Sequence, residues 1–287
     1  MKKRINLVLF NLLLSLFAFA KTTNLEEALR QKWVSATVVM QDDATSSKRG
    51  IHLLLKSFIK EDLLVTIPVG FVFQAQDSSF QDFIHLEKKD LPVPALTSQG
   101  LFLKASCIRA TRRCPSNGAI FLATTLASSQ LLALTTFAFQ QNLHDIGSMQ
   151  SALWAISDNH GLAGIGNLEL TKFVAQRLNK PMPDYSVNYI YQDLPGETSE
   201  NTLQPLAIQG VFHYALTSDQ ELKLDLVDAT GKSVLANLGM AEVMSSKKGR
   251  HKFTFELELK GVGRGTYFVK LTTVKDGSEL ASKQVVF

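Results

Sequence analysis

The feature that most constrains the fold is an alternation of apolar and polar residues along three segments of the C-terminal third. Successive side chains of a strand point to opposite faces, so each segment predicts a strand with one buried and one solvated face. Hairpin turns are predicted at Asp228–Gly231 and at Asp276–Gly277. Two sheets packed face to face would bury all the apolar faces. The alternating apolar residues are Leu222, Leu224, Leu226, Phe253, Phe255, Leu257, Leu259, Tyr267, Val269 and Leu271.

Further strands are predicted in the N-terminal half. Short β-branched or apolar runs occupy 34–40, 51–58, 63–67 and 101–108, separated by polar or proline-containing segments. The charged turn Lys60–Asp62 lies between the second and third runs and predicts that these two strands form an antiparallel pair. This spacing is typical of a β-sandwich or barrel.

Helices are predicted where the apolar period changes to that of a helix. Residues 114–143 carry no charge but many Thr, Ser and Gln, which favours a buried helix, lined by Leu131, Leu134, Ala138 and Gln141, over a membrane span. Ser148 is a predicted N-cap for a second helix, and Asn167 for a third. The chain is therefore predicted to be mainly β with α: a β-sandwich domain with C-terminal helices at 21–190, a linker at 191–204 and a second β-sandwich at 205–287.

The first twenty residues have the layout of a secretory signal peptide. Lys2, Lys3 and Arg4 precede an apolar run that ends at Ala18–Ala20, and this run is shorter than a membrane span. We expect cleavage after Ala20 and a protein that is secreted, at the cell surface or in the periplasm, with no membrane span in the mature chain.

The charge and the cysteine content limit the classes of function that this chain could have. The formal net charge of +4 includes the three basic residues of the leader, so the rest of the chain has no general attraction for nucleic acid. The basic clusters at 109–113 and 247–250 are interpreted as solvated loop charges. Cys107 and Cys114 are the only cysteines, and in an oxidising compartment they are predicted to form a disulfide. No metal or other cofactor is predicted, because no histidine lies at ligand spacing from them.

Catalytic motifs are missing from the sequence. Neither Gly-x-Ser-x-Gly nor His-Glu-x-x-His occurs. A hydrolase would have to use dispersed residues such as His144 or His160, and we therefore predict that the protein is not an enzyme.

The segment Met149-Gln150-Ser151-Ala152-Leu153-Trp154 follows a β-rich region that contains Cys107. This order resembles bacterial thioester adhesion domains, in which a strand-end cysteine is joined to a glutamine side chain. The resemblance implies a Cys107–Gln150 thioester that a partner's amine could attack. Cys114 is a competing partner for Cys107. The position before the reactive cysteine, which is usually aromatic in these domains, is occupied by Ser106 here.

The C-terminal segments 224–232 and 265–271 include an Asp-x-x-Gly turn and a Gly-x-Tyr strand. They resemble the immunoglobulin-like C-terminal domains of type IX secretion cargo and hook-capping proteins, although the Pro-Asn-Pro entry motif is missing. The resemblance implies an immunoglobulin-like sandwich with a sorting role, in which Lys283 belongs to the signal region and the secretion machinery is a partner.

Together these patterns predict an exported, non-catalytic surface protein that binds or adheres to a surface or host ligand. The alternatives are a covalent adhesin that uses Cys107 and Gln150, and a secreted hydrolase with an accessory sandwich.

Overall fold

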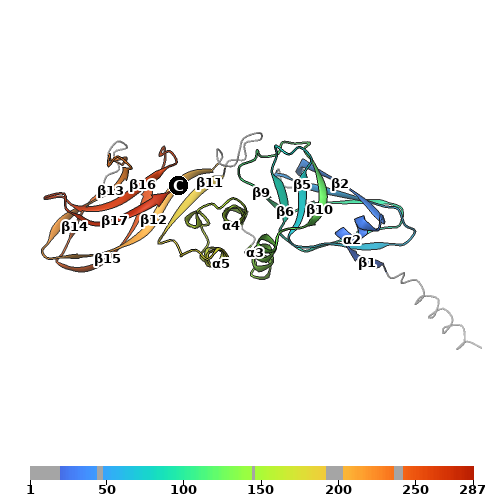
Figure 1. Ribbon diagram of the computed structural model, residues 1–287, viewed down its shortest axis with the longest axis horizontal. Helices are drawn as coiled ribbons and strands as arrows, with labels where there is room; N and C mark the ends of the chain where they lie inside the picture. Colours follow the sequence, from blue (N-terminus) through green and yellow to red (C-terminus); the bar gives the residue numbers. More distant parts are fainter. Residues whose placement is uncertain (1–19, 44–47, 144–145, 192–202, 236–241) are drawn as a thin grey trace, which may run out of the picture. The chain divides into compact units, whose positions relative to one another are not determined.

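Strands make up most of the regular structure in the computed structural model, which describes residues 20–43, 48–143, 146–191, 203–235 and 242–287. The protein is mainly β, with several antiparallel sheets and a half-barrel (Figure 1). The chain divides into two compact units between His144 and Asp145. Within the described residues no helix is long and apolar enough to cross a bilayer. The predicted leader, apart from Ala20, lies outside the described residues.

The first unit contains ten strands and two helices among its described residues. The strands are β1 (Lys21–Asn24), β2 (Val34–Asp43), β3 (Lys48–Ser57), β4 (Leu63–Ile67), β5 (Phe71–Ala75), β6 (Asp82–His85), β7 (Lys89–Val93), β8 (Ser98–Leu103), β9 (Ala105–Ile108) and β10 (Ile120–Leu126). The helices are α2 (Leu25–Arg30) and α3 (Ser129–Gln140).

These strands form a three-stranded sheet, β1-β4-β7, and a seven-stranded sheet, β8-β3-β2-β10-β5-β6-β9. The prediction that the strands around Lys60–Asp62 pair with each other is wrong. β3 pairs with β2 and β8, whereas β4 pairs with β1 and β7 in the other sheet. The turn thus carries the chain from one sheet to the other, and the alternating burial of Leu63, Val65 and Ile67 gives β4 one core face.

Two other predicted elements are each divided. The single strand expected at 101–108 is interrupted at Lys104, and its halves β8 and β9 lie at opposite edges of the seven-stranded sheet. The uncharged segment 114–143 forms β10 before α3 begins. Leu131, Leu134 and Ala138 are buried on α3 as predicted, but Gln141 is its exposed C-cap.

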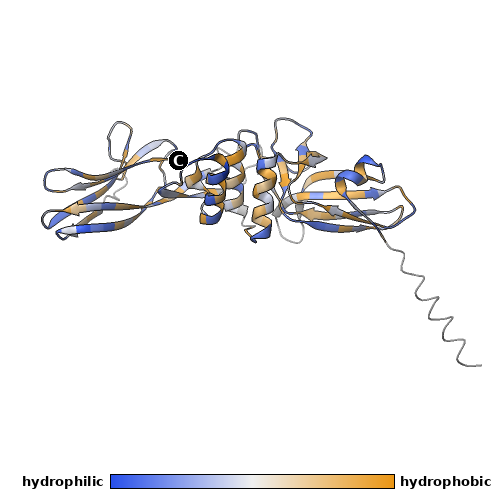
Figure 2. Cartoon of the chain, turned by 60° about the horizontal axis from the view of Figure 1, so that its bottom comes forward, coloured by the Kyte–Doolittle hydropathy of each residue, from blue (hydrophilic) through white to orange (hydrophobic). Residues whose placement is uncertain are grey.

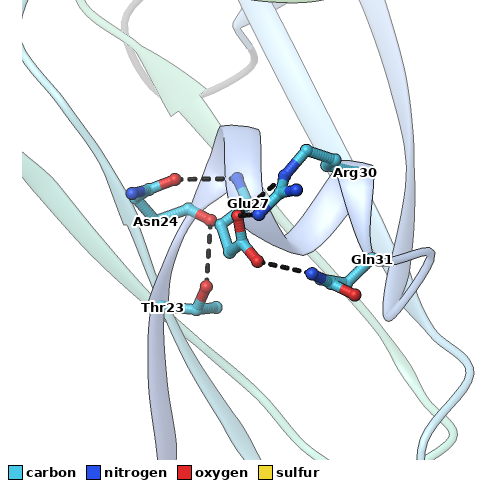
Figure 3. A network of polar contacts seen from close by, with 5 residues as sticks. All are labelled: Thr23, Asn24, Glu27, Arg30 and Gln31. Carbon is cyan, nitrogen blue, oxygen red and sulfur yellow. Dashed lines mark hydrogen bonds and ion pairs between the residues drawn. The ribbon is translucent and has the colours of Figure 1, made fainter.

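Helix α2 starts at a polar cap that its sequence encodes locally (Figure 3). The side-chain Oδ1 of Asn24 accepts a hydrogen bond of 2.8 Å from the backbone N–H of Glu27. The Glu27 carboxylate accepts hydrogen bonds from Arg30 Nε at 2.9 Å and from Gln31 Nε2 at 2.8 Å. These bonds lower the pKa of Glu27, with Arg30 as the largest cause. Such a cap supplies an acceptor to a helix-start N–H that has no partner within the helix.

The second unit begins with helices and continues with strands. Its helical elements are α4 (Ile146–Ser157), the 3-10 turn η1 (Leu162–Gly164) and α5 (Leu168–Leu178). Its strands are β11 (Tyr185–Tyr191), β12 (Leu203–Leu216), β13 (Gln220–Asp228), β14 (Glu242–Ser246), β15 (Gly249–Glu258), β16 (Thr266–Thr273) and β17 (Glu279–Val286).

Two antiparallel sheets, β11-β12-β15 and β14-β13-β16-β17, share one hydrophobic core. The predicted alternation is confirmed here, because Leu222, Leu224 and Leu226 are all at most 1% exposed. In Figure 2 the strands of this unit change repeatedly between hydrophilic and hydrophobic residues along their length. The predicted turn at 228–231 is also present: Asp228 Oδ1 accepts hydrogen bonds from the backbone N–H groups of Thr230 and Lys232. Gly231 has a φ of 85°, which favours glycine.

The division of the chain differs from the one expected from composition. The sequence predicts an N-terminal domain at 21–190 that includes the helices and residues 185–190, with a linker at 191–204. In the structure β11 is hydrogen-bonded to β12, from the pair Tyr185↔Gly210 to Tyr191↔Leu203. Ala163 of η1 belongs to the same core as both sheets. Residues 192–202 of the predicted linker lie outside the described residues.

A candidate ligand-binding cavity

The second unit contains a cavity of about 440 Å³ where its helices meet β11 and the end of β17. This volume is within the range of about 300–1,000 Å³ that is usual for small-molecule sites. Its lining comes from five parts of the chain: α4, the loop through η1, the segment from Lys180 to Tyr189, Arg264 in the loop before β16, and Val286–Phe287 at the end of β17.

Aromatic side chains form much of the wall. Tyr185 and Tyr189 lie four residues apart on β11 and therefore on the same face of the strand, together with the buried Val187. Both line the cavity and pack against the core of the sheets. Trp154 of α4 is fully buried and lines the cavity from the helical side.

The position of the Tyr-bearing strand is fixed at its start. The Tyr185 hydroxyl accepts a hydrogen bond of 3.0 Å from the backbone N–H of Val286. Lys283 of β17 forms an ion pair with Asp184, and its side chain is only 10% exposed. These contacts connect β11 to β17 of the other sheet, and Tyr185 and Val286, which one of them joins, both line the cavity.

Basic and polar groups also line the cavity. Lys180 donates a hydrogen bond of 2.6 Å from Nζ to Oδ1 of Asn159. Asn159 follows the end of α4 with a left-handed φ of 59°, which asparagine tolerates well. The ring of His160 lies 5.9 Å from that of Trp154, between ring centroids. Arg264 lines the cavity too, and its charge acts on Tyr189.

The tyrosine hydroxyl in this wall stays protonated at neutral pH. Burial raises the pKa of Tyr189 to about 12, and the positive charge of Arg264 opposes part of that rise. A protonated phenol both donates and accepts hydrogen bonds. The cavity therefore offers flat rings, hydrogen-bond donors and positive charge to a ligand.

The predicted disulfide is not present among the described residues. Cys107 and Cys114 are both buried, at 7% and 2% exposed. Cys107 lies in β9, where it pairs with Phe83 of β6, and Cys114 Sγ lies 3.7 Å from Nε2 of the buried Gln81. Disulfide formation by these residues stays a prediction for the protein in an oxidising compartment.

The predicted thioester partners belong to different units. Cys107 is in the first unit, whereas Gln150 is in α4 of the second and is 8% exposed. Gln150 and Trp154, four residues apart, are both buried on α4. The thioester itself stays a prediction.

Of the two histidines considered for a hydrolase, His160 lines the cavity together with Ser151, and His144 lies outside the described residues. No group of three or more metal-ligating side chains occurs in the described part of the chain.

The basic clusters have ion-pair partners in the structure. Arg109 Nε lies 3.1 Å from the Asp82 carboxylate, and Arg112 lies 3.7 Å from it, although Asp82 is almost completely buried. Lys247 pairs with Asp219 at 2.9 Å. Arg109 is paired and still exposed, as expected of a solvated charge, whereas the Arg112 side chain is only 26% exposed, so for Arg112 the interpretation as a solvated charge needs correction.

No family model, curated protein or solved structure matches this chain. The cavity itself was not predicted from the sequence. Tyr185, Tyr189 and Arg264 are distant from Trp154 along the chain, and only the pairing of β11 with β12 and the tie to β17 bring them together. The one local signal is the spacing of four between Tyr185 and Tyr189, which in a strand places both rings on one face.

Proposed function

We propose that this is an exported binding protein that holds an external ligand in the cavity of its second unit. The observation that supports this is the cavity of about 440 Å³ with aromatic rings and basic side chains among its lining residues. Binding sites of this kind combine apolar walls with a few polar groups that fix orientation. The leader-like residues 1–20 support action outside the cytoplasm.

For the fold, we propose an N-terminal β-sandwich and, in the second unit, an immunoglobulin-like sandwich. The shared core of β11-β12-β15 and β14-β13-β16-β17 supports the second part. Type IX secretion is proposed as the delivery route on the resemblance of 224–232 and 265–271. Fractionation of producing cells tests the proposed location. Processed protein outside the cytoplasm supports export, and an uncut chain in the cytosol contradicts it.

The binding function is tested on glycan and peptide arrays, by comparing the wild type with a variant whose cavity is blocked. Ser151 is a half-buried lining residue of α4, so Ser151→Phe would place a ring in the cavity. The matched control is Ser157→Phe, since Ser157 is exposed on the same helix and does not line the cavity. We expect a glycan or peptide ligand that the wild type and Ser157→Phe retain and Ser151→Phe loses. Binding that is equal in all three proteins would contradict the proposal.

The two alternatives give different readouts. Ser151 and His160 at one cavity favour testing a hydrolase, and turnover of ester, glycoside or peptide substrates that is lost in His160→Ala would replace the binding proposal. For the covalent adhesin, intact mass distinguishes the chemistry: a Cys107–Gln150 thioester loses one ammonia, whereas a disulfide loses two hydrogens.

A further inference from the structure

We propose that the cavity of the second unit selects a ring compound that carries a carboxylate, with Lys180 and Arg264 as the residues that bind the carboxylate. This inference rests on the proposed binding function, because it names the ligand class of the same cavity.

The charged side chains that line the cavity are basic. Lys180 and Arg264 line the cavity, and among its described lining residues there is no aspartate or glutamate side chain. Two basic side chains in a lining without an aspartate or glutamate side chain favour an anionic ligand. Arg264 is exposed, so a ligand in solution can reach it.

Lys180 is held in place for this role. Its ammonium has three donors, and the hydrogen bond to Asn159 Oδ1 uses one of them. Because Asn159 is neutral, it orients Lys180 without cancelling its charge. A carboxylate could therefore accept a charge-assisted hydrogen bond from the same nitrogen.

The ring of the ligand is inferred from the aromatic side chains that line the cavity. Tyr185 and Tyr189 present two half-buried rings from one face of β11. Flat apolar surfaces suit a flat or ring-shaped ligand, and phenolic hydroxyls add hydrogen bonds at its edge. A sugar acid and an aromatic acid share this chemistry, and the probes below distinguish them.

Calorimetric titration of the full chain with four probes tests the ligand class: D-glucuronate, D-glucose, benzoate and benzyl alcohol. We expect at least one of the two acids to bind at least tenfold more tightly than its neutral counterpart. The acid that binds more tightly identifies the source as a sugar acid or an aromatic acid. Equal affinity for acid and neutral ring, or no binding of either acid, would overturn the inference.

Two variants test the residue roles. Asn159→Asp keeps the shape of the side chain but adds a negative charge beside Lys180, and we expect it to weaken binding of the acid at least tenfold. Arg264→Gln should have a similar effect, and neither should change binding of a neutral ring. Asn142→Asp is the matched control, because Asn142 is exposed, has a φ of 55° and belongs to the first unit.

Unchanged affinity for the acid in both variants, with thermal unfolding confirming that they fold, would overturn the assignment. The binding function is judged separately by the Ser151→Phe array experiment. A ligand lost in that variant, together with no preference for acids, would leave the binding proposal standing and remove this one.

Discussion

The ring of Tyr189 lies against the backbone of Gly164, so closely that a Cβ at position 164 would be 2.7 Å from Cε2 of the tyrosine. Real Cβ atoms almost never come so close, and the ring would have to move. The contact joins η1 to β11, and it therefore sets the distance between the helical side of the cavity and its aromatic wall.

A methyl group at this contact should disturb both stability and binding. Overpacking of this kind costs about 1–3 kcal/mol, so Gly164→Ala should lower the free energy of unfolding by that amount and weaken ligand binding. Gly161→Ala is the control, because Gly161 lines the same cavity with a φ of −66° and nothing within 4 Å of its Cβ position. Chemical denaturation measures the effect. A Gly164→Ala protein as stable as the control would mean that Tyr189 is not confined by this contact.

Alkaline unfolding should depend on Tyr189. Its pKa is raised to about 12 by burial, so the folded protein favours the neutral phenol. The unfolded chain ionises near pH 10, so the contribution is complete below that pH and is lost between pH 10 and about 12. The loss is roughly 2–3 kcal/mol. Tyr189→Phe should be less sensitive to pH than the wild type in this window, as measured by urea unfolding. Parallel pH dependence in the two proteins would show that the phenol is not desolvated.

Acid unfolding of the first unit should depend on His85. This residue is fully buried, and burial lowers its pKa to about 4. Nδ1 donates a hydrogen bond of 3.0 Å to the Lys104 carbonyl, and Nε2 has no hydrogen-bond partner among the described residues. The charges of Glu87 and Lys89 act on it in opposite directions. The unfolded chain gains a proton near pH 6.5, so this contribution is present above that pH and is lost as pH falls to about 4.

The expected loss from His85 is roughly 3 kcal/mol. His85→Asn should remove that part of the pH dependence, whereas the exposed His213→Asn should keep it. Fluorotryptophan labelling follows each unit separately, because Trp33 lies in the first and Trp154 in the second. A wild-type Trp33 transition with the same stability at pH 4 and pH 7 would contradict the burial of a neutral imidazole.

The cap of α2 should contribute measurably to the first unit. Asn24→Ala removes the acceptor of the Glu27 N–H and should cost about 1 kcal/mol, while Asn24→Ser should retain most of the stability. Urea unfolding followed at Trp33 measures the difference. Equal loss in the two variants would show that the side-chain oxygen is not what stabilises the start of the helix.

Much of the local structure could be predicted from sequence, because it is encoded within single segments. Leu222, Leu224 and Leu226 alternate with polar residues and lie on one buried face, and Asn167 caps α5 by accepting a hydrogen bond from Leu170 N–H at 3.0 Å. The choice of which strands pair with each other was not encoded within single segments. The apolar runs at 51–58 and 63–67 fit two sheets as well as one, and the pattern at 101–108 does not reveal that Lys104 separates strands on opposite edges.

The cavity could not be predicted from the sequence for the same reason. Trp154 and His160 could be singled out as a helical residue and a dispersed histidine, but their neighbours Tyr185, Tyr189 and Arg264 arrive through sheet pairing. Composition also placed the boundary after residue 190, since the turn-rich segment that follows resembles a linker. The pairing of Tyr185 with Gly210 puts the strands on both sides of that segment in one sheet.

The most direct test of the cavity as the binding site uses the two tryptophan indole N–H signals in an NMR titration of the labelled full chain with D-glucuronate or benzoate. Trp154 lines the cavity, whereas Trp33 belongs to the first unit, and Trp33→Phe assigns the signals. We predict a saturable shift of the Trp154 signal with Trp33 unchanged. A saturable shift of Trp33 alone, or a Trp154 signal that stays fixed while calorimetry reports binding, would contradict the account.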